Sequence, residues 1–480
     1  MKLSMLTALA TATLAGCMVG PDYVRPAVDT PAAWRIDYPK AAEVANTKWW
    51  EQFGDPVLNE LIETSLHENR DVRIAAARVD QFIGALMSTR SQLFPQVGYG
   101  ADVSRFRASR VSVPALPPGV DNYFTLYEAA LGTSWQLDLF GRVRRLTEAA
   151  QAQVYASQQG QRGVVLTLVA SVASSYIGLR ALDRQREIAQ ATASNFGETA
   201  RIFKLRFKAG MVSQTEVSQI DSQYQQALAA IPGIEQAIAG QENLLSLLQG
   251  RNSGPIPRGK TIDQLIPPLI PADLPSTLLE RRPDVLQAEQ NLVAANANIG
   301  AARALYFPSF SLTGALGSAS TAFGTFLSGP AAAWLIGASM VGPIFTFGAI
   351  EGQVRGAEAG ERQALGVYQQ TILNAFRETN DALTGSQKKI EEVARQTERV
   401  TSLREFARLS RLRFDKGVAS YLDVLVAENE LFAAELAAVS LLAQRYNQLV
   451  SVYQAMGGGW VDIAGSMAPK PQDLAAASQP

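Results

Sequence analysis

The sequence predicts a mainly helical chain that contains two copies of one unit, each made of two strands followed by a long helix. Three observations predict this fold class. Short motifs recur at a fixed distance along the 480 residues, apolar residues alternate in two short stretches of each copy, and long helical patterns follow those stretches. No run of 18 apolar residues occurs, so we expect any crossing of a membrane to use the strands, as a β-barrel.

The composition argues against several classes of function. Lys and Arg number 43 against 44 Asp and Glu and are scattered, so nothing suggests nucleic acid binding. One His and one Cys cannot build a Cys-rich zinc site, and no metal-ligand cluster or catalytic constellation is visible, so we predict no enzyme activity, no metal and no cofactor. Residues 254–261 match a nucleotide-binding pattern by letter, but Pro255 and Pro257 remove N–H donors that such a loop needs.

The chain is an internal duplication. The recurring motifs are Asp71-Val72 with Asp284-Val285, Phe94-Pro95 with Phe307-Pro308, Phe140-Gly141 with Phe347-Gly348, and Arg206-Phe207 with Arg413-Phe414. The first two pairs are 213 residues apart and the last two 207, so the copies differ by six residues in length. This period is far longer than the roughly 20–50 residues of solenoid repeats, which indicates a duplicated domain.

The two copies have the same internal order. The first covers 56–249 and the second 281–456. A helix over 56–94 lies between Pro56 and Pro95, and strands then follow in each copy. From the alternation of apolar residues we expect strands at about 96–113, 123–140, 308–318 and 331–347.

Each copy continues into a helical hairpin. The predicted helices cover about 142–208, 212–248, 349–414 and 419–456. Apolar residues seven apart in the second hairpin indicate coiled-coil pairing. The helix over 142–208 would be about 100 Å long, so we expect an elongated helical cylinder with strands at one end and turns at the other.

Four strands are too few to close a barrel, and open sheet edges are not tolerated in lipid. Three chains of four strands each would supply 12, within the range of outer-membrane barrels. The sequence therefore predicts a 12-stranded barrel shared by three chains and continued by a helical tunnel.

The remaining segments flank or connect the copies. Residues 1–16 read as a signal peptide, 17–55 as an N-terminal extension, 250–280 as a Pro-rich connector and 457–480 as a C-terminal tail. Within the tail, Pro469-Lys470-Pro471 and the final six residues look disordered.

Cys17 is the only cysteine, and its position is informative. Leu14-Ala15-Gly16-Cys17 follows a short apolar stretch and resembles the bacterial lipobox, in which the cysteine becomes a lipidated amino terminus. This resemblance implies a covalent diacylglycerol and an N-acyl chain such as palmitate on Cys17. An ordinary signal peptide with an incidental cysteine is the alternative.

Several motifs then resemble one family, the lipidated outer-membrane channels of the TolC family. They are Gly20-Pro21-Asp22-Tyr23, Trp49-Trp50, Phe53-Gly54-Asp55-Pro56, Arg281-Arg282-Pro283-Asp284-Val285 and Tyr421-Leu422-Asp423-Val424-Leu425. The resemblance implies a homotrimer in the outer membrane and periplasm that acts as a passive exit duct for drugs or other small toxic compounds. The partners that it implies are a periplasmic adaptor and an inner-membrane transporter of the resistance-nodulation-division class.

Two other classes of function remain open from the sequence. One is the outer-membrane duct of a one-step protein secretion system, and the other is a structural envelope lipoprotein. The strand pairs in both copies argue against the second.

The resemblance also assigns the two hairpin turns. Gly210 and Met211 in the first, and Gly417 and Val418 in the second, would form the tips that meet the adaptor. The family usually has Leu or Thr after the glycine, so Met211 and Val418 depart from its pattern.

The start of the last long helix would form the periplasmic gate. Members of the family commonly carry acidic residues three apart there, which form rings in the closed channel. This chain has Asp423 but Val426 at the second position, and Glu428 lies on another helical face. Leu422 or Val426 would add an apolar constriction. Alternatively, Asp423 only stabilises the helix dipole, typically by about 0.3–1 kcal/mol.

The reading of Cys17 is directly testable. Cys17→Ser should abolish lipidation and leave the chain unanchored or poorly sorted, while trimers still form because the barrel provides its own hold on the membrane. Mass spectrometry of the mature protein measures this, and a wild-type protein without an acyl chain would contradict the lipobox assignment.

Overall fold

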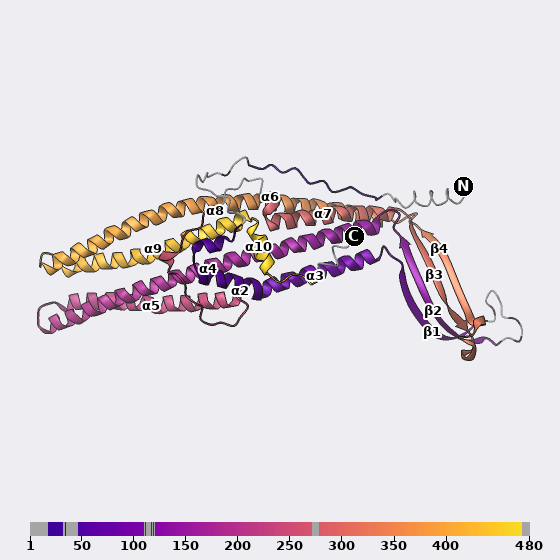
Figure 1. Ribbon diagram of the computed structural model, residues 1–480, viewed down its shortest axis with the longest axis horizontal. Coiled ribbons are helices and arrows are strands. Elements are labelled where there is room, and N and C mark those ends of the chain that lie inside the picture. The colour runs from indigo at the N-terminus through magenta and orange to yellow at the C-terminus, as the bar shows by residue number, and fades with distance from the viewer. Residues whose placement is uncertain are drawn as a thin grey trace.

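The computed structural model describes residues 18–31, 34, 47–109, 111, 117, 119, 121–270 and 278–472. The molecule is elongated, with a β-sheet at one end and the turns of two helical hairpins at the other (Figure 1). Cys17, the predicted signal peptide and the last residues of the tail lie outside the described residues.

The element order repeats the predicted duplication. The first copy contains α2 (Pro56–Glu68), α3 (Arg70–Ser91), β1 (Gln96–Arg107), β2 (Tyr123–Leu137), α4 (Arg142–Lys208) and α5 (Gln214–Leu248). The second contains α6 (Leu278–Arg281), α7 (Pro283–Arg303), β3 (Ser309–Ser320), β4 (Ala332–Val341), α8 (Ala349–Asp415) and α9 (Tyr421–Met456). A short 3₁₀-helix, η1 (Trp49–Phe53), precedes the first copy, and α10 (Trp460–Met467) follows the second.

The single helix predicted over 56–94 is wrong, because Asn69 divides it into α2 and α3. Asn69 has an extended backbone, and its side-chain oxygen accepts the N–H groups of Asp71 and Val72 at 2.8 and 3.2 Å. This is N-cap geometry, which starts a new helix. The Asn69 amide also donates to the carbonyl of Leu248 at 2.8 Å, which fixes the break against the end of α5.

The strands differ from their predicted ends. β1 ends at Arg107 rather than near 113, β2 at Leu137 rather than 140, and β4 covers Ala332–Val341 rather than 331–347. β3 extends two residues beyond the predicted 318. β2 stops where the Asp138 carboxylate accepts the N–H groups of Val143 and Arg144 and so caps α4. β4 stops before Pro343, which has no N–H to donate.

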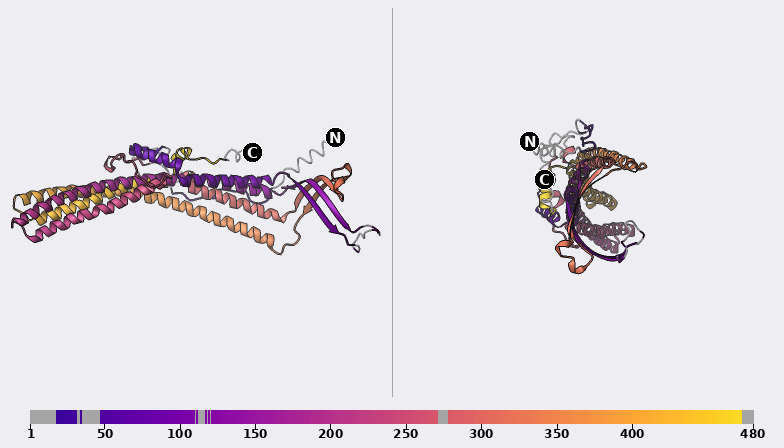
Figure 2. Two further views of the ribbon diagram at one scale, coloured as in Figure 1. Left: turned by 90° about the horizontal axis from the view of Figure 1, so that it is seen from below. Right: turned by 90° about the vertical axis from the view of Figure 1, so that its right-hand side faces the viewer.

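The four strands form one antiparallel sheet in the order β1-β2-β3-β4, which is curved rather than flat (Figure 2). One face is apolar. A row of large side chains crosses it, because Tyr99 lies opposite Leu131, Leu131 opposite Leu316, and Leu316 opposite Trp334. All four side chains are largely exposed, as is typical of a surface that contacts lipid or a partner.

The opposite face carries mostly small or polar residues, among them Asp102, Glu128, Ser311 and Gly337, with Phe106, Phe124 and Leu335 as large apolar exceptions. This division into an apolar and a polar face is the pattern of a strand that separates lipid from an aqueous lumen.

The long helix α4 is the core of the helical part. It packs against α3, α5, α7 and α9. Among the described helices, only α4 contains a stretch long and apolar enough to cross a membrane, but 72% of that stretch is buried inside the protein. We therefore assign it to the core.

α2 and α10 contact each other on one side of the long helices, near their middle (Figure 2), and an aromatic cluster packs there. Trp460 packs edge-on against Trp49 and Trp50, and Trp49 stacks on Tyr453 with ring centroids 5.0 Å apart. The predicted disorder at 469–471 is wrong, because this part of the tail covers α4. Gln161 donates to the carbonyl of Pro469 at 3.1 Å.

The segment that matches a nucleotide-binding pattern has a structural role. The backbone N–H of Gly259 donates to the Tyr176 hydroxyl, and that of Lys260 donates to the buried Asp55 carboxylate, both at 2.9 Å. Tyr176 itself donates to Asp55 at 2.8 Å. The donors that a phosphate would require are therefore used within the protein.

Candidate functional site

The two hairpin turns have the same backbone geometry. Gly210 and Gly417 adopt left-handed conformations, with φ of 72° and 74°. The N–H of Met211 donates to the carbonyl of Arg206, and the N–H of Val418 does the same to Arg413, at 2.9 and 3.0 Å. In this Schellman-type ending, backbone carbonyls in the last turns of α4 and α8 accept hydrogen bonds from the residues that follow the helices. The left-handed position favours glycine, because a β-carbon there would clash with the backbone.

The turns present apolar side chains at the far end of the molecule. Met211 and Val418 are both largely exposed. The turns differ in how the next helix begins. Ser213 forms a capping box with Glu216, whereas the Ser420 side chain caps nothing in the described structure. The second turn is therefore the less constrained of the two.

The three predicted gate residues lie on one face of α9. Leu422, Asp423 and Val426 are exposed, while Tyr421, Val424 and Leu425 are buried on the opposite face.

Asp423 lies in the first turn of α9, where a carboxylate also stabilises the helix dipole. The geometry thus leaves both sequence interpretations of Asp423 in place.

The start of α9 is held by an aromatic cluster that the sequence did not predict. The Tyr421 ring lies 4.5 Å from Phe203 of α4 and 5.0 Å from Phe414 of α8, measured between centroids. The Arg411 guanidinium lies 5.8 Å from the Tyr421 ring centroid. These contacts join the α4–α5 hairpin to the α8–α9 hairpin. They lie on the side of α9 opposite to the exposed Leu422 and Val426.

Glu428 is partly buried beside this cluster and does not share the exposed face of Leu422, Asp423 and Val426, as its offset from Asp423 predicted. Its carboxylate is 3.6 Å from Arg411. Burial raises the pKa of Glu428, and the nearby Arg411 only partly opposes this shift. The charged form is therefore less stable here than in water.

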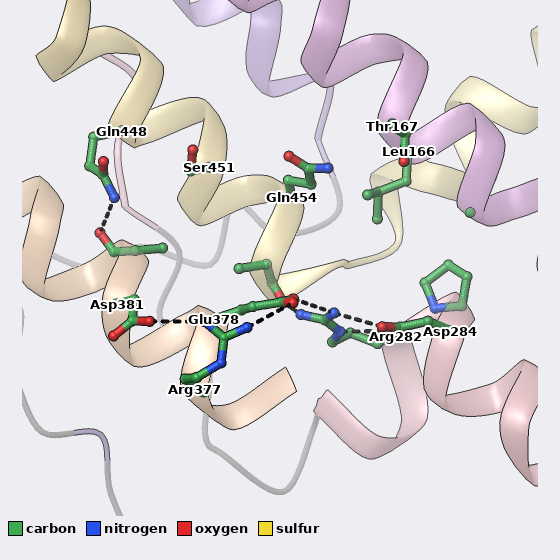
Figure 3. A pocket seen from close by; sticks show the side chains of 14 residues that line it. Leu166, Thr167, Arg282, Asp284, Arg377, Glu378, Asp381, Gln448, Ser451 and Gln454 are labelled. Carbon is green, nitrogen blue, oxygen red and sulfur yellow. Dashed lines mark hydrogen bonds and ion pairs between the residues drawn. The ribbon is translucent and has the colours of Figure 1, made fainter. Parts of the chain in front are cut away.

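A second charged site surrounds the motif Arg281-Arg282-Pro283-Asp284-Val285. Arg282 is buried and donates to Asp284 and to Glu378, both at 2.7 Å, and to the carbonyl of Ala455 at 2.8 Å. Figure 3 shows Arg282 between the two carboxylates. These three side chains line a cavity of about 500 Å³. These bonds join the start of α7 to α8 and to the end of α9, so the motif stabilises the junction of the second copy.

Metal coordination finds no support in the described part of the chain. No group of three or more His, Cys, Asp or Glu side chains there is placed to hold an ion.

A duplicated unit with an exposed apolar sheet face, continued by long helical hairpins, defines a channel-forming protein of the outer membrane. The family model for outer membrane efflux proteins matches residues 61–251 and 274–458. The chain belongs to this family, and it spans the outer membrane and extends into the periplasm.

Relatives of similar length support the assignment. The chain is 35% identical to the toluene efflux pump outer membrane protein TtgC of Pseudomonas putida, over 97% of each chain. It is 31% identical to the cation efflux system protein CusC of Escherichia coli, over 93% of this chain and 96% of the relative.

Solved structures show the same fold. The outer-membrane channel OprN superposes with a TM-score of 0.85 at 29% identity, covering 93% of this chain and all of that one. The open state of the MtrE channel of Neisseria gonorrhoeae gives 0.84 at 28% identity, covering 95% of this chain and all of that one. The predicted family, fold class and location are confirmed.

The partly buried Glu428 generates a pH prediction. Because its pKa is raised in the folded state, Glu428 favours folding below the ordinary carboxyl pKa, and this contribution is lost as the pH rises through the folded-state value. Glu428→Gln should therefore have a higher Tm than the wild type at pH 7 and a similar Tm near pH 4. Thermal unfolding at both pH values, with the exposed Glu430→Gln as control, measures this. A lower Tm of Glu428→Gln at pH 7 would show that the ion pair with Arg411 outweighs the cost of burial.

Proposed function

We propose that three copies of this chain form a passive exit duct through the outer membrane and periplasm. The observation that carries the proposal is a four-stranded sheet with an apolar face and two edges, β1 and β4, that pair on one side only within the described chain. Three such sheets supply the 12 strands of a closed barrel, and closure removes every edge from lipid.

The internal duplication indicates how the copies meet. In the chain, Gln96 lies opposite Ser134, and Ser309 lies opposite Val341. The same offsets of 213 and 207 residues that relate the sequence motifs convert the first pair into the second. Within the chain, β2 pairs with β3. Adding 207 to a residue of β2 gives its counterpart in β4, and subtracting 213 from a residue of β3 gives its counterpart in β1. By this rule β4 would pair with β1 of the next copy, with Ser339 opposite the partner's Asp102.

The same offsets between the two copies predict an aromatic contact between chains at the junction of sheet and helices. Phe140 stacks on Phe307, with centroids 4.6 Å apart. Their counterparts in the duplication are Phe347 and Phe94, which are 90% and 57% exposed in the single chain. Phe347 also has a φ of 50°, a conformation uncommon for a bulky residue. In the trimer Phe347 would stack on the partner's Phe94.

The predicted partners act at the opposite end. The exposed Met211 and Val418 give the turns an apolar surface that a periplasmic adaptor could cover, and an inner-membrane transporter of the resistance-nodulation-division class would supply the energy. Relatives are named for the efflux of toluene and of cations, so we propose small toxic compounds as the exported class.

The gate would lie next to these turns. Three copies of Leu422, Asp423 and Val426 would form an apolar and acidic constriction. A lipid on Cys17 would anchor each copy to the membrane.

Deletion of the gene tests the function. The deletion strain should become hypersensitive to toxic compounds, and expression of the wild-type chain should restore resistance. Loss of a secreted protein without hypersensitivity would favour the secretion duct, and envelope defects alone would favour the structural lipoprotein.

Cysteine cross-linking tests the contact between copies. Ser339→Cys with Asp102→Cys should give covalent dimers and trimers on non-reducing gels. The matched pair Ser339→Cys with Gly98→Cys, four residues out of register on the same face, should not. Cross-linking of the second pair in preference to the first would contradict the register.

The gate generates an electrical prediction. Asp423→Ala should raise the single-channel conductance in planar bilayers and weaken the preference for cations, because three carboxylates leave the constriction. The isosteric Asp423→Asn should lose cation preference with a smaller change in conductance, and Glu398→Ala on the exposed surface of α8 should behave as wild type. Unchanged conductance and selectivity of Asp423→Ala would exclude Asp423 from the gate.

A further inference from the structure

Residues 18–25 form an extended segment that lies along α7, beginning beside the sheet (Figure 1). At its start, the N–H of Val19 donates to the carbonyl of Phe140, just beyond the end of β2, at 3.2 Å. Asn296 donates to the carbonyl of Pro21 at 3.1 Å, and further along Arg25 donates to Glu289 at 2.9 Å. The segment therefore runs antiparallel to α7 and is bonded along its length.

Arg145, in the first turn of α4, binds the start of this segment. The side chain is only 2% exposed. Its guanidinium donates to the carbonyls of Val19 and Gly20 at 3.3 and 3.4 Å and to Asp22 at 2.7 Å, and also to Glu148 at 2.8 Å. Three of these four acceptors belong to the segment.

A buried cation is stable only when its donors are satisfied. If the segment left, the Arg145 guanidinium would retain only Glu148 among these acceptors. Two of the acceptors are backbone carbonyls, so the interaction fixes the path of the chain and not merely one side chain. An ordinary ion pair between helices would not have this property.

Glycines allow the close approach. Gly20 has a φ of 103°, and a β-carbon there would lie 2.4 Å from the Cα of Gly300. A β-carbon on Gly141 would lie 2.7 Å from the side chain of Met18. Such distances are too short for any side chain, so residues 18–20 fit against α4 and α7 at backbone contact.

We propose that Arg145, Gly20 and Gly300 form a dock that fixes the chain directly after Cys17 at the junction of sheet and helices. The dock sets the depth at which a lipid on Cys17 enters the membrane, and Arg145 is its positioning residue. Without the dock, residues 18–25 would be a tether of up to about 26 Å, and the lipid would impose no constraint on the height of the sheet. The depth-setting role rests on the lipid anchor proposed above, whereas the dock itself does not.

Proteolysis of the full-length protein tests the dock. Chymotrypsin cleaves after Tyr23 only when the segment leaves α7, and the product starting at Val24 is identified by mass. The wild type should resist, and Arg145→Met and Gly300→Ala should be cleaved several-fold faster. Arg303→Met, a surface arginine of α7 paired with Glu358, is the matched control and should resist. Equal cleavage of Arg145→Met and Arg303→Met would overturn the dock.

A double-mutant cycle with Cys17 tests the depth-setting role. Arg145→Met should lower the amount of chain in the outer-membrane fraction when Cys17 is lipidated, and it should add no further loss to Cys17→Ser. If the two losses instead add in the double variant, Arg145 acts only on the stability of the fold and the depth-setting role is wrong. A wild-type chain without an acyl group would overturn the anchor and that role together, while the proteolysis result would still decide whether the dock exists.

Discussion

The structure depends on one constraint, the need to satisfy the backbone N–H and C=O groups at the two edges of the sheet. Within the described chain β2 and β3 are paired on both sides, while β1 and β4 are paired on one. Each unpaired group costs several kcal/mol in hydrocarbon, so a sheet with an apolar outer face cannot remain open there. In the trimer proposed above the duplication would provide the solution, because β4 of one chain would pair with β1 of the next as β2 pairs with β3 within the chain.

The long helices relate the position of the sheet to that of the distant hairpin turns. α4 and α8 both have 67 residues and begin directly after the sheet, so the position of each strand pair determines that of a hairpin turn far away. The motifs in between hold the helices together. Arg282 joins α7, α8 and α9, and Asp55 joins the start of α2 to the connector through Lys260.

Elements with local sequence signals could be predicted well. The helix expected over 142–208 is found at Arg142–Lys208, because Gly141 precedes it and Gly210 ends it. The turn glycines also follow from local pattern, whereas Leu422, Asp423 and Val426 were singled out by the resemblance to the family. The register of the sheet was not predicted, since alternation fixes the face of a side chain but not its partner on the next strand.

Features that depend on distant contacts could not be predicted. The Asn69 amide donates to Leu248, about 180 residues later, which fixes the break between α2 and α3, and α10 is stable because Trp460 packs against indoles more than 400 residues earlier. The dock for residues 18–25 likewise joins Arg145 and Gly300 to the N-terminal segment. No local pattern marks such pairs in a single sequence.

Native mass spectrometry of the full-length protein, released from detergent, tests the central claim most directly. The account predicts one dominant species that contains three chains, because only three four-stranded sheets complete the proposed barrel. A dominant monomer, dimer or any other number of copies under conditions that preserve the fold would contradict it.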